Sequence, residues 1–229
     1  MNSFNLLFIL IVLSACNAQQ NSTHENVIAN SENWIVEQQP GGKVVFNTHA
    51  MKIIDAKGCT VWYKKKLEGN IKIEYDITII DKDGPYDRVS DMNCFWMAND
   101  PNNPDDFFKE SKQRAGHFPN YHNLKLYYVG YGGHNNTKTR FRRYNGDIER
   151  PLLPDHDLSG KEYMIMANKK MHIEISVKDN YTTYRRDGNV IFEVYDSEPY
   201  SKGYFGFRTI TNHLEIENFN ISELEVSEK

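Results

Sequence analysis

Apolar and polar residues alternate along much of the chain with a period of two, which is the pattern of half-buried β-strands. The clearest example covers residues 71–79, where Ile and Tyr alternate with Lys, Glu, Asp and Thr. Residues 173–177 repeat the pattern with Ile and Val. Further strands are expected over residues 43–47, 60–64, 92–97, 124–130, 138–144, 204–208 and 214–225.

The connections between these runs predict turns rather than helices. Asp187-Gly188 separates strand-like residues 181–186 from 190–195, and this dipeptide is typical of a tight hairpin turn. One short helix is expected at residues 103–106, where Asn103 would be the cap and a proline would occupy the first position. Many short strands with almost no helix predict an all-β fold, a β-sandwich or jelly roll, in a single domain.

Composition narrows the class of protein. The chain has 229 residues, of which 13% are aromatic, and its formal net charge is −4. The aromatic content excludes a disordered chain, and the absence of a basic excess argues against nucleic acid as a partner. No repeat and no second domain are visible.

The N-terminal residues predict export. A short apolar stretch ends in Leu13-Ser14-Ala15-Cys16, which resembles a bacterial lipobox. We therefore expect a lipoprotein signal peptide over residues 1–15, lipidation at Cys16, a flexible tether over 16–31 and the folded domain over 32–229. The protein would then be an exported lipoprotein of the outer membrane or periplasm, held to the membrane by its lipid. An ordinary signal peptide with an incidental cysteine is the alternative.

Two cysteines remain after such processing, Cys59 and Cys94. They could form a disulfide in an oxidising compartment or stay as two buried thiols, and the sequence leaves both possibilities open. Their spacing from histidines does not indicate zinc, and neither a metal nor a cofactor is expected.

Strand alternation also sorts polar side chains near the C-terminus. In residues 204–208, two phenylalanines point to one face, so Arg208 points to the other. After the next turn, the same alternation turns His213 away from the core. We therefore expect Arg208 and His213 on one exposed sheet face, where Gly206 would leave room for a ligand. The alternative is a solvated surface without a ligand.

Residues 127–144 contain the densest group of chemically active side chains. Glycines around Tyr131 and His134 allow a bulge or a close approach of the backbone. Arg140 and Arg142 share one face of the following strand. Arginine binds carboxylates or sulfates with paired hydrogen bonds, and His and Tyr can transfer protons. The segment therefore predicts a ligand site, with a flexible hairpin bearing solubilising arginines as the alternative.

Three motifs support a family resemblance: WMANDP at 96–101, YYVGYGG at 127–133 followed by NNTKTRFRRY at 135–144, and GFRT at 206–209 followed by Asn212-His213. They resemble the concanavalin-like jelly-roll domains encoded in polysaccharide-utilisation clusters of Bacteroidota, over residues 59–219. Within this group the sequence is similar to dehydratases of ulvan degradation. That resemblance implies loss of water from the non-reducing-end uronic acid of an oligosaccharide, which gives a 4,5-unsaturated sugar.

Such an elimination needs a cation at the carboxylate, a base for the C5 proton and an acid for the C4 oxygen. The candidates for proton transfer are His134, His213 and, in reserve, Tyr131. The candidates for substrate binding are Arg208, Arg140, Arg142, Asn93 and Asn135. His117 and His122 are loop residues that could border the site.

Three other activities stay open. A polysaccharide lyase would use the same residues to cleave a glycosidic bond instead of releasing water. A glycoside hydrolase would need two carboxylates, for which Glu215 with Glu217 and Glu74 with Asp76 have suitable spacing. A carbohydrate-binding protein would hold an acidic oligosaccharide without turnover.

Overall fold

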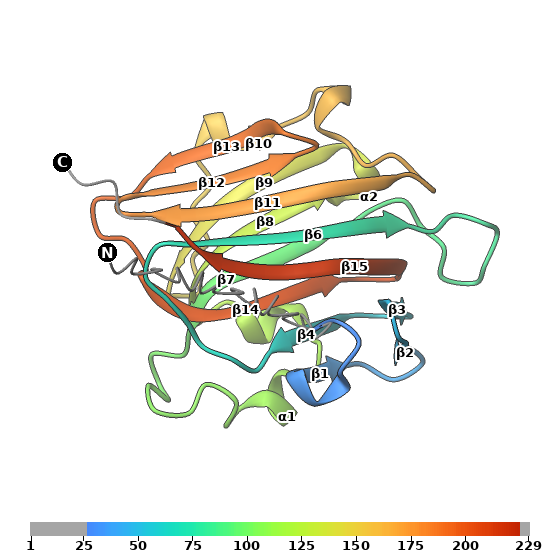
Figure 1. The fold of residues 1–229 in the computed structure, drawn as a ribbon, viewed down its shortest axis with the longest axis horizontal. Coiled ribbons are helices and arrows are strands. Elements are labelled where there is room, and N and C mark those ends of the chain that lie inside the picture. Colours follow the sequence, from blue (N-terminus) through green and yellow to red (C-terminus); the bar gives the residue numbers. More distant parts are fainter. Residues whose placement is uncertain (1–26, 225–229) are drawn as a thin grey trace, which may run out of the picture.

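The alternating segments form two antiparallel sheets that pack face to face in a computed structural model, which describes residues 27–224 (Figure 1). Sheet A has the strand order β1-β4-β14-β7-β8-β9-β10, with β5 paired to β14. Its strands are β1 (Trp34–Gln38), β4 (Cys59–Tyr63), β5 (Leu67–Glu68), β7 (Asn93–Asn99), β8 (Lys125–Gly132), β9 (Lys138–Asn145), β10 (Asp157–Leu158) and β14 (Lys202–Thr209).

Sheet B has the order β13-β12-β11-β6-β15-β3-β2 and faces the viewer in Figure 1. Its strands are β2 (Lys43–Phe46), β3 (Ala50–Asp55), β6 (Ile71–Ile79), β11 (Lys170–Lys178), β12 (Tyr181–Arg186), β13 (Asn189–Tyr195) and β15 (Asn212–Glu223). Between residues 27 and 224, helical turns are confined to η1 (Ser31–Asn33), α1 (Ser111–Arg114), η2 (Phe118–Tyr121), α2 (Gly133–Asn136), η3 (Pro154–His156) and η4 (Lys161–Tyr163). Within the described residues, no helix is long and apolar enough to span a membrane.

The main core lies between the two sheets and is built by the strand alternation. In β6, every second residue from Ile71 to Ile79 is buried. Phe205 and Phe207 of β14 enter the same core, where Phe207 meets Tyr75 of β6 edge to face. Trp96 spans the layers, because its indole N–H donates to Thr182 Oγ1 of sheet B at 3.0 Å. Apolar burial and these specific contacts hold the two sheets as one domain.

A second, smaller core covers part of the outer face of sheet A. The long connection from β7 to β8, which includes α1 and η2, folds back over Trp62, Phe95 and Tyr128. A buried ion pair fixes it there: Arg114 of α1 contacts Glu37 of β1 at 2.9 Å. The sheet face that this connection leaves open carries the site described below.

Most expected strands are confirmed, and the all-β sandwich is the observed fold. Asp187 and Gly188 both have positive φ, as the tight hairpin requires. The prediction of a helix at residues 103–106 is wrong, because this stretch forms turns and α1 begins at Ser111. Strands β1, β3, β5 and β10 were not expected.

The two cysteines, Cys59 and Cys94, are buried free thiols, and burial raises the pKa of both.

The packed domain extends further toward the N-terminus than expected. Ile28 is fully buried in the main core, although it falls in the range expected to be tether. Trp34 Nε1 donates to the carbonyl oxygen of Val27 at 3.1 Å, and this hydrogen bond attaches residues 27–28 to the domain. The signal peptide, Cys16 and most of the expected tether lie outside the described residues.

Candidate functional site

A polar cavity of about 340 Å³ opens on the outer face of sheet A, at the end where β8 and β9 are joined by α2. We call it the arginine pocket. It is lined by Asp91, Phe118, Tyr128, Gly130, Gly133, His134, Arg140, Arg142 and Arg150. Four of these residues come from strands β8 and β9, and the others come from connections that meet the sheet there.

Cross-strand pairing places the central side chains. Tyr128 of β8 lies opposite Arg142 of β9, and Gly130 lies opposite Arg140. Phe141 alternates with the two arginines and is buried in the main core. Arg140 and Arg142 therefore share the outer face, as the sequence predicts.

The hairpin at α2 brings His134 to the rim of the pocket. Gly132, His134 and Asn135 all have positive φ, so the chain turns sharply back toward β9. Arg140 Nη1 donates to His134 Nε2 at 2.5 Å. Because a guanidinium N–H can only donate, His134 Nε2 is the acceptor of this hydrogen bond. The contact therefore assigns the imidazole proton to Nδ1.

The positive charge of the pocket is only partly compensated. Arg140 pairs with Asp157 through two hydrogen bonds, of 2.9 and 3.1 Å. Asp91, the one carboxylate that lines the pocket, already pairs with Arg88. Within residues 27–224, no carboxylate lies within ion-pair distance of Arg142, Arg150 or Arg208. A second anion, supplied by a ligand, would compensate these guanidinium groups.

Arg208 contributes to this charge from below the surface. It is on the outer face of sheet A, as expected, but only 1% of it is exposed because Phe118 and Tyr121 cover its guanidinium. Its Nη1 donates to the carbonyl oxygen of Gly116 at 2.5 Å and to Thr60 Oγ1 at 3.2 Å. With Phe118 in this position, the Arg208 guanidinium is shielded from direct contact with the arginine pocket.

Three expectations about this face are wrong. Arg208 and His213 do not share a sheet, because β14 belongs to sheet A and β15 to sheet B. His213 instead contacts Asp87 of the β6–β7 loop, at 3.1 Å between Nδ1 and Oδ1. Gly206 leaves no room for a ligand, since the ring of Trp62 fills the space above it.

Tyr131 is the third correction, because it points away from the pocket. Alternation along β8 turns it into the main core, where it is fully buried beside Tyr184. Its hydroxyl accepts a hydrogen bond from Arg186 Nη1 at 2.5 Å, and burial raises its pKa to about 12. It cannot reach a ligand bound on the outer face.

Tyr128 is the tyrosine that sequence reasoning missed. It is on the same strand, three residues earlier, and burial raises its pKa well above the usual value of 10. The signal was present in the alternation: Val129 marks the core face, so residues 128 and 130 belong to the outer face. Sequence reasoning also missed three further residues that line the pocket, Arg150, Phe118 and Asp91, because they lie in connections that have no periodic pattern.

Gly130 makes the position of Tyr128 possible. A Cβ atom at residue 130 would lie 2.6 Å from the Tyr128 hydroxyl, so Gly130→Ala would push this ring out of place. Gly133→Ala is the matched control, because its Cβ would have no neighbour closer than 3.8 Å. We expect Gly130→Ala to weaken binding of an anionic ligand in the arginine pocket about tenfold, measured by calorimetry. Equal affinities in both variants would contradict this role of Gly130.

The two asparagines differ in their surroundings. Asn93 lies opposite Arg208 in the pairing of β7 with β14, and its buried Oδ1 has no hydrogen-bond partner among the described residues. Asn135 is exposed at the hairpin, where its Oδ1 accepts from Arg88 Nη1 at 2.9 Å. Asn93 is thus beside the buried cation, and Asn135 is at the rim.

His122 lies behind the pocket wall, packed edge-on against Phe118. Its Nε2 is buried without a partner among the described residues. Burial lowers its pKa from 6.5 to about 4, and the positive charges of Arg150, Arg142 and Arg208 add to this shift. His122 is therefore neutral at pH 7. His117, the other loop histidine, is exposed.

This pKa shift predicts a specific pH dependence of stability. The folded protein disfavours protonated His122, so stability is complete above pH 6.5 and is lost as pH falls toward 4. In His122→Asn, the fall of the unfolding free energy between these pH values should be smaller by about 1–2 kcal/mol, since partial solvent exposure limits the effect. Denaturant titration at each pH measures it. His49→Asn, which removes an exposed histidine, should retain the wild-type slope.

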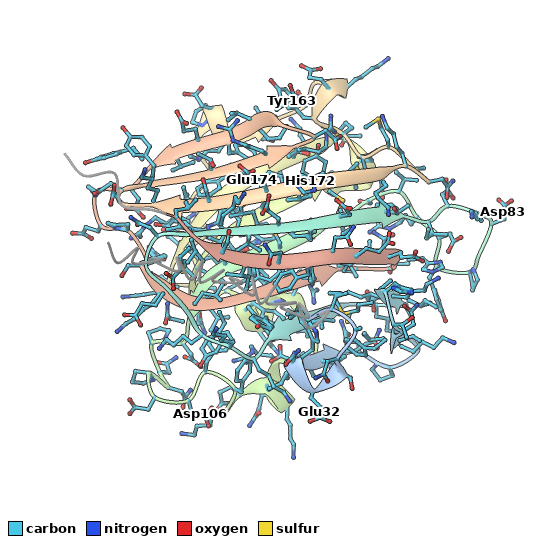
Figure 2. The ribbon with its side chains drawn as sticks, viewed as in Figure 1. Glu32, Asp83, Asp106, Tyr163, His172 and Glu174 are labelled. Carbon is cyan, nitrogen blue, oxygen red and sulfur yellow. The ribbon has the colours of Figure 1, made fainter. Side chains whose placement is uncertain are left out.

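The carboxylate pairs considered for hydrolysis lie on the other side of the molecule. They are on the outer face of sheet B, where Figure 2 shows His172 and Glu174. Glu215 contacts Lys52 at 2.6 Å, and Glu217 contacts Lys170 at 2.7 Å. Asp76 contacts His172 at 2.8 Å. Glu215, Glu217 and Glu74 are thus paired with lysines across a sheet surface, and Asp76 is hydrogen-bonded to His172, an arrangement that does not favour hydrolysis.

Comparison with known proteins gives one family and several structures of the same fold. The family model of a domain of unknown function, DUF6250, matches residues 53–219. No curated protein sequence matches the chain. A protein of unknown function with a galectin-like fold from Bacillus subtilis has a TM-score of 0.65 at 17% identity, covering 86% of this chain and 94% of that one.

Two further structures of this fold are carbohydrate-binding domains by name. The carbohydrate-binding module CBM66 from Bacillus subtilis has a TM-score of 0.56 at 15% identity, covering 83% of this chain and 96% of its own. The carbohydrate recognition domain of Emp46p, in a metal-free form, has a TM-score of 0.58 at 13% identity, covering 86% and 90%. At these identities the likeness establishes the galectin-like, concanavalin-like sandwich fold.

Proposed function

From the premise that this chain belongs to the DUF6250 family, we propose that it binds the uronic-acid end of an ulvan-type oligosaccharide in the arginine pocket and eliminates water from that sugar. One observation carries the proposal. Arg142 and Arg150 line one cavity without a carboxylate partner in the described chain, and Arg208 is buried behind Phe118 of the same cavity, which leaves a site for an anion. A carbohydrate-binding module and a carbohydrate recognition domain share this fold, which supports a saccharide as the bearer of that anion.

The chemistry is a β-elimination. A base removes the proton at C5, the C4–O bond breaks, a C4=C5 double bond forms, and the departing oxygen takes up a proton to leave as water. Arg142 and Arg150 would bind the carboxylate and stabilise the negative charge that develops on it. Arg208 would add to this stabilisation from beneath Phe118.

Two pocket side chains fit the proton transfers. His134 has an unprotonated Nε2, which becomes a base once the carboxylate draws Arg140 away from it. Tyr128 remains protonated at neutral pH because its pKa is raised by burial, so its hydroxyl can donate to the departing oxygen. Asn135, at the rim, would orient a sugar hydroxyl, and Asn93, beside Arg208, is a candidate for the same role.

Binding without turnover is the second candidate function. One observation favours it: His134 Nε2 is already occupied by Arg140 at 2.5 Å. If this hydrogen bond persists in the complex, the pocket holds the acidic sugar but has no free base. The two functions use the same cavity and differ in whether a product forms.

Incubation with uronate-ended oligosaccharides tests both candidates. We expect an ultraviolet absorbance from the conjugated enol acid, together with a mass loss of one water. Shorter fragments would instead identify a polysaccharide lyase. Binding without a product at any pH would leave only the recognition role. If the oligosaccharides neither bind nor give a product, the proposal is overturned.

We also propose that the protein is exported and anchored through lipid on Cys16, in the outer membrane or facing the periplasm. The lipobox-like residues 13–16 support this location. Cys16→Ser should move the protein from the membrane fraction to the soluble fraction after cell fractionation. Cys59→Ser, at a buried thiol, is the control and should stay with the membrane.

A further inference from the structure

A second polar cavity, of about 410 Å³, lies over the opposite end of β7 and β8, beside α1. We call it the amide pocket. Its carboxamides come from Asn102, Asn103, Gln113, Asn120 and Asn123. The short η2 segment separates the two cavities, because Phe118 lines the arginine pocket and Asn120 lines the amide pocket. Figure 2 shows Asp106, in the same connection, at the edge of the molecule.

The walls of the amide pocket are held in place by their own hydrogen bonds. Asp100 Oδ1 accepts from the backbone N–H of Asn102 at 2.9 Å, and its Oδ2 accepts from Asn103 Nδ2 at 3.0 Å. Asn120 Nδ2 donates to the carbonyl oxygen of Gln113 at 2.8 Å. Several polar groups are therefore fixed before any ligand arrives, which lowers the entropic cost of binding.

Arg114 adds an unused donor to this cavity. The residue is 2% exposed and lines the pocket, and its Nε and Nη2 bind Glu37 and the backbone. Its Nη1 is buried and has no hydrogen-bond partner among the described residues. An unpartnered buried N–H group is unfavourable, so a ligand that accepts a hydrogen bond there would gain affinity.

The charges of the lining residues restrict the chemistry of that ligand. Asp100 and Glu110 repel an anion, and the positive charge of Arg114 is already paired with Glu37. The unpartnered N–H of Arg114 disfavours a metal ion, and no group of His, Cys, Asp or Glu in the described residues is arranged to hold one. A neutral molecule that both donates and accepts hydrogen bonds fits these walls.

We propose that the amide pocket binds a neutral pyranose, as a second saccharide site distinct from the arginine pocket. Sugar hydroxyls can accept from Arg114 and the carboxamide N–H groups and donate to Asp100 and Glu110. The volume is within the range of small-molecule sites. This inference does not depend on elimination chemistry, because none of the residues proposed for proton transfer lines the amide pocket.

Titration with D-glucose, D-galactose and D-xylose, followed by the side-chain amide signals in nitrogen-15 NMR spectra, tests the proposal. We expect saturable shifts of the Asn120 and Asn123 signals with at least one of these sugars, at millimolar affinity. D-glucuronate should bind there more weakly than D-glucose, because its carboxylate meets Asp100 and Glu110.

Variants separate the two pockets. The double variant Gln113→Ala/Asn123→Ala changes two exposed residues and should weaken neutral-sugar binding at least about tenfold. Arg142→Ala, in the arginine pocket, should leave neutral-sugar binding in the amide pocket unchanged. No saturable shift with any of the three sugars would overturn the proposal. Undiminished binding in the double variant, or tighter binding of D-glucuronate at these residues, would overturn it as well.

Discussion

Tyr128→Phe is expected to lower kcat for the proposed elimination by about 10²–10⁴-fold while KM changes little. The variant removes only the hydroxyl that would protonate the departing C4 oxygen, and the ring that packs on Phe95 and Phe118 remains. Because the loss affects an interaction made in the transition state, substrate binding is preserved. Initial rates from the ultraviolet absorbance of the product, at several oligosaccharide concentrations, measure both constants.

Tyr131→Phe is the matched control for this experiment. It removes a hydroxyl from the same strand but from the opposite face, where Arg186 donates to it. We expect full kcat and a free energy of unfolding lower by about 1 kcal/mol, since a partly buried guanidinium N–H of Arg186 loses its acceptor. Equal kcat in Tyr128→Phe and wild type would remove Tyr128 from the mechanism, and His134 would then need another acid as its partner.

Glu37→Ala is expected to lower the free energy of unfolding by about 3–5 kcal/mol, the largest effect on stability. Its carboxylate is almost fully buried, contacts Arg114 at 2.9 Å and accepts from the Tyr121 hydroxyl at 2.6 Å. The variant leaves Arg114 as a buried charge without a counterion. Glu32→Ala, at an exposed residue of η1, should change stability by less than about 0.5 kcal/mol.

The same substitution tests how the β7–β8 connection is attached to sheet A. Chemical denaturation followed by tryptophan fluorescence gives the free energies of both variants. An unchanged midpoint in Glu37→Ala would mean that aromatic packing alone holds the connection. A loss of acidic-saccharide binding in the folded variant would show that the connection also positions Phe118 and His122 at the arginine pocket.

Local patterns predicted most of the strands and part of one pocket wall. The alternation in residues 138–144 places Arg140 and Arg142 on one face and Phe141 on the other, and this follows from strand geometry alone. The same rule separates the two tyrosines, because Val129 marks the core face of β8: Tyr131 shares that face, and Tyr128 belongs to the outer face.

The remaining errors come from contacts between distant parts of the chain. Alternation places Arg208 and His213 outward, but it does not say that the chain changes sheets between them. Phe118, which covers Arg208, belongs to a connection without periodic structure. The amide pocket depends on the same connection. Turn residues such as Asn103 show that the chain bends, and they do not show what it covers afterwards.

The strand order of sheet A also has a consequence for how the chain folds. Strand β14 lies between β4 and β7, so Trp62 pairs with Gly206 across most of the sequence. Such pairing carries a loop-closure cost before it gains any contact, and β-sandwiches rich in it fold in about milliseconds to seconds. A chain still being synthesised cannot complete sheet A until residues 202–209 have left the ribosome. Its early strands are therefore exposed to solvent and to aggregation for most of the time that translation takes.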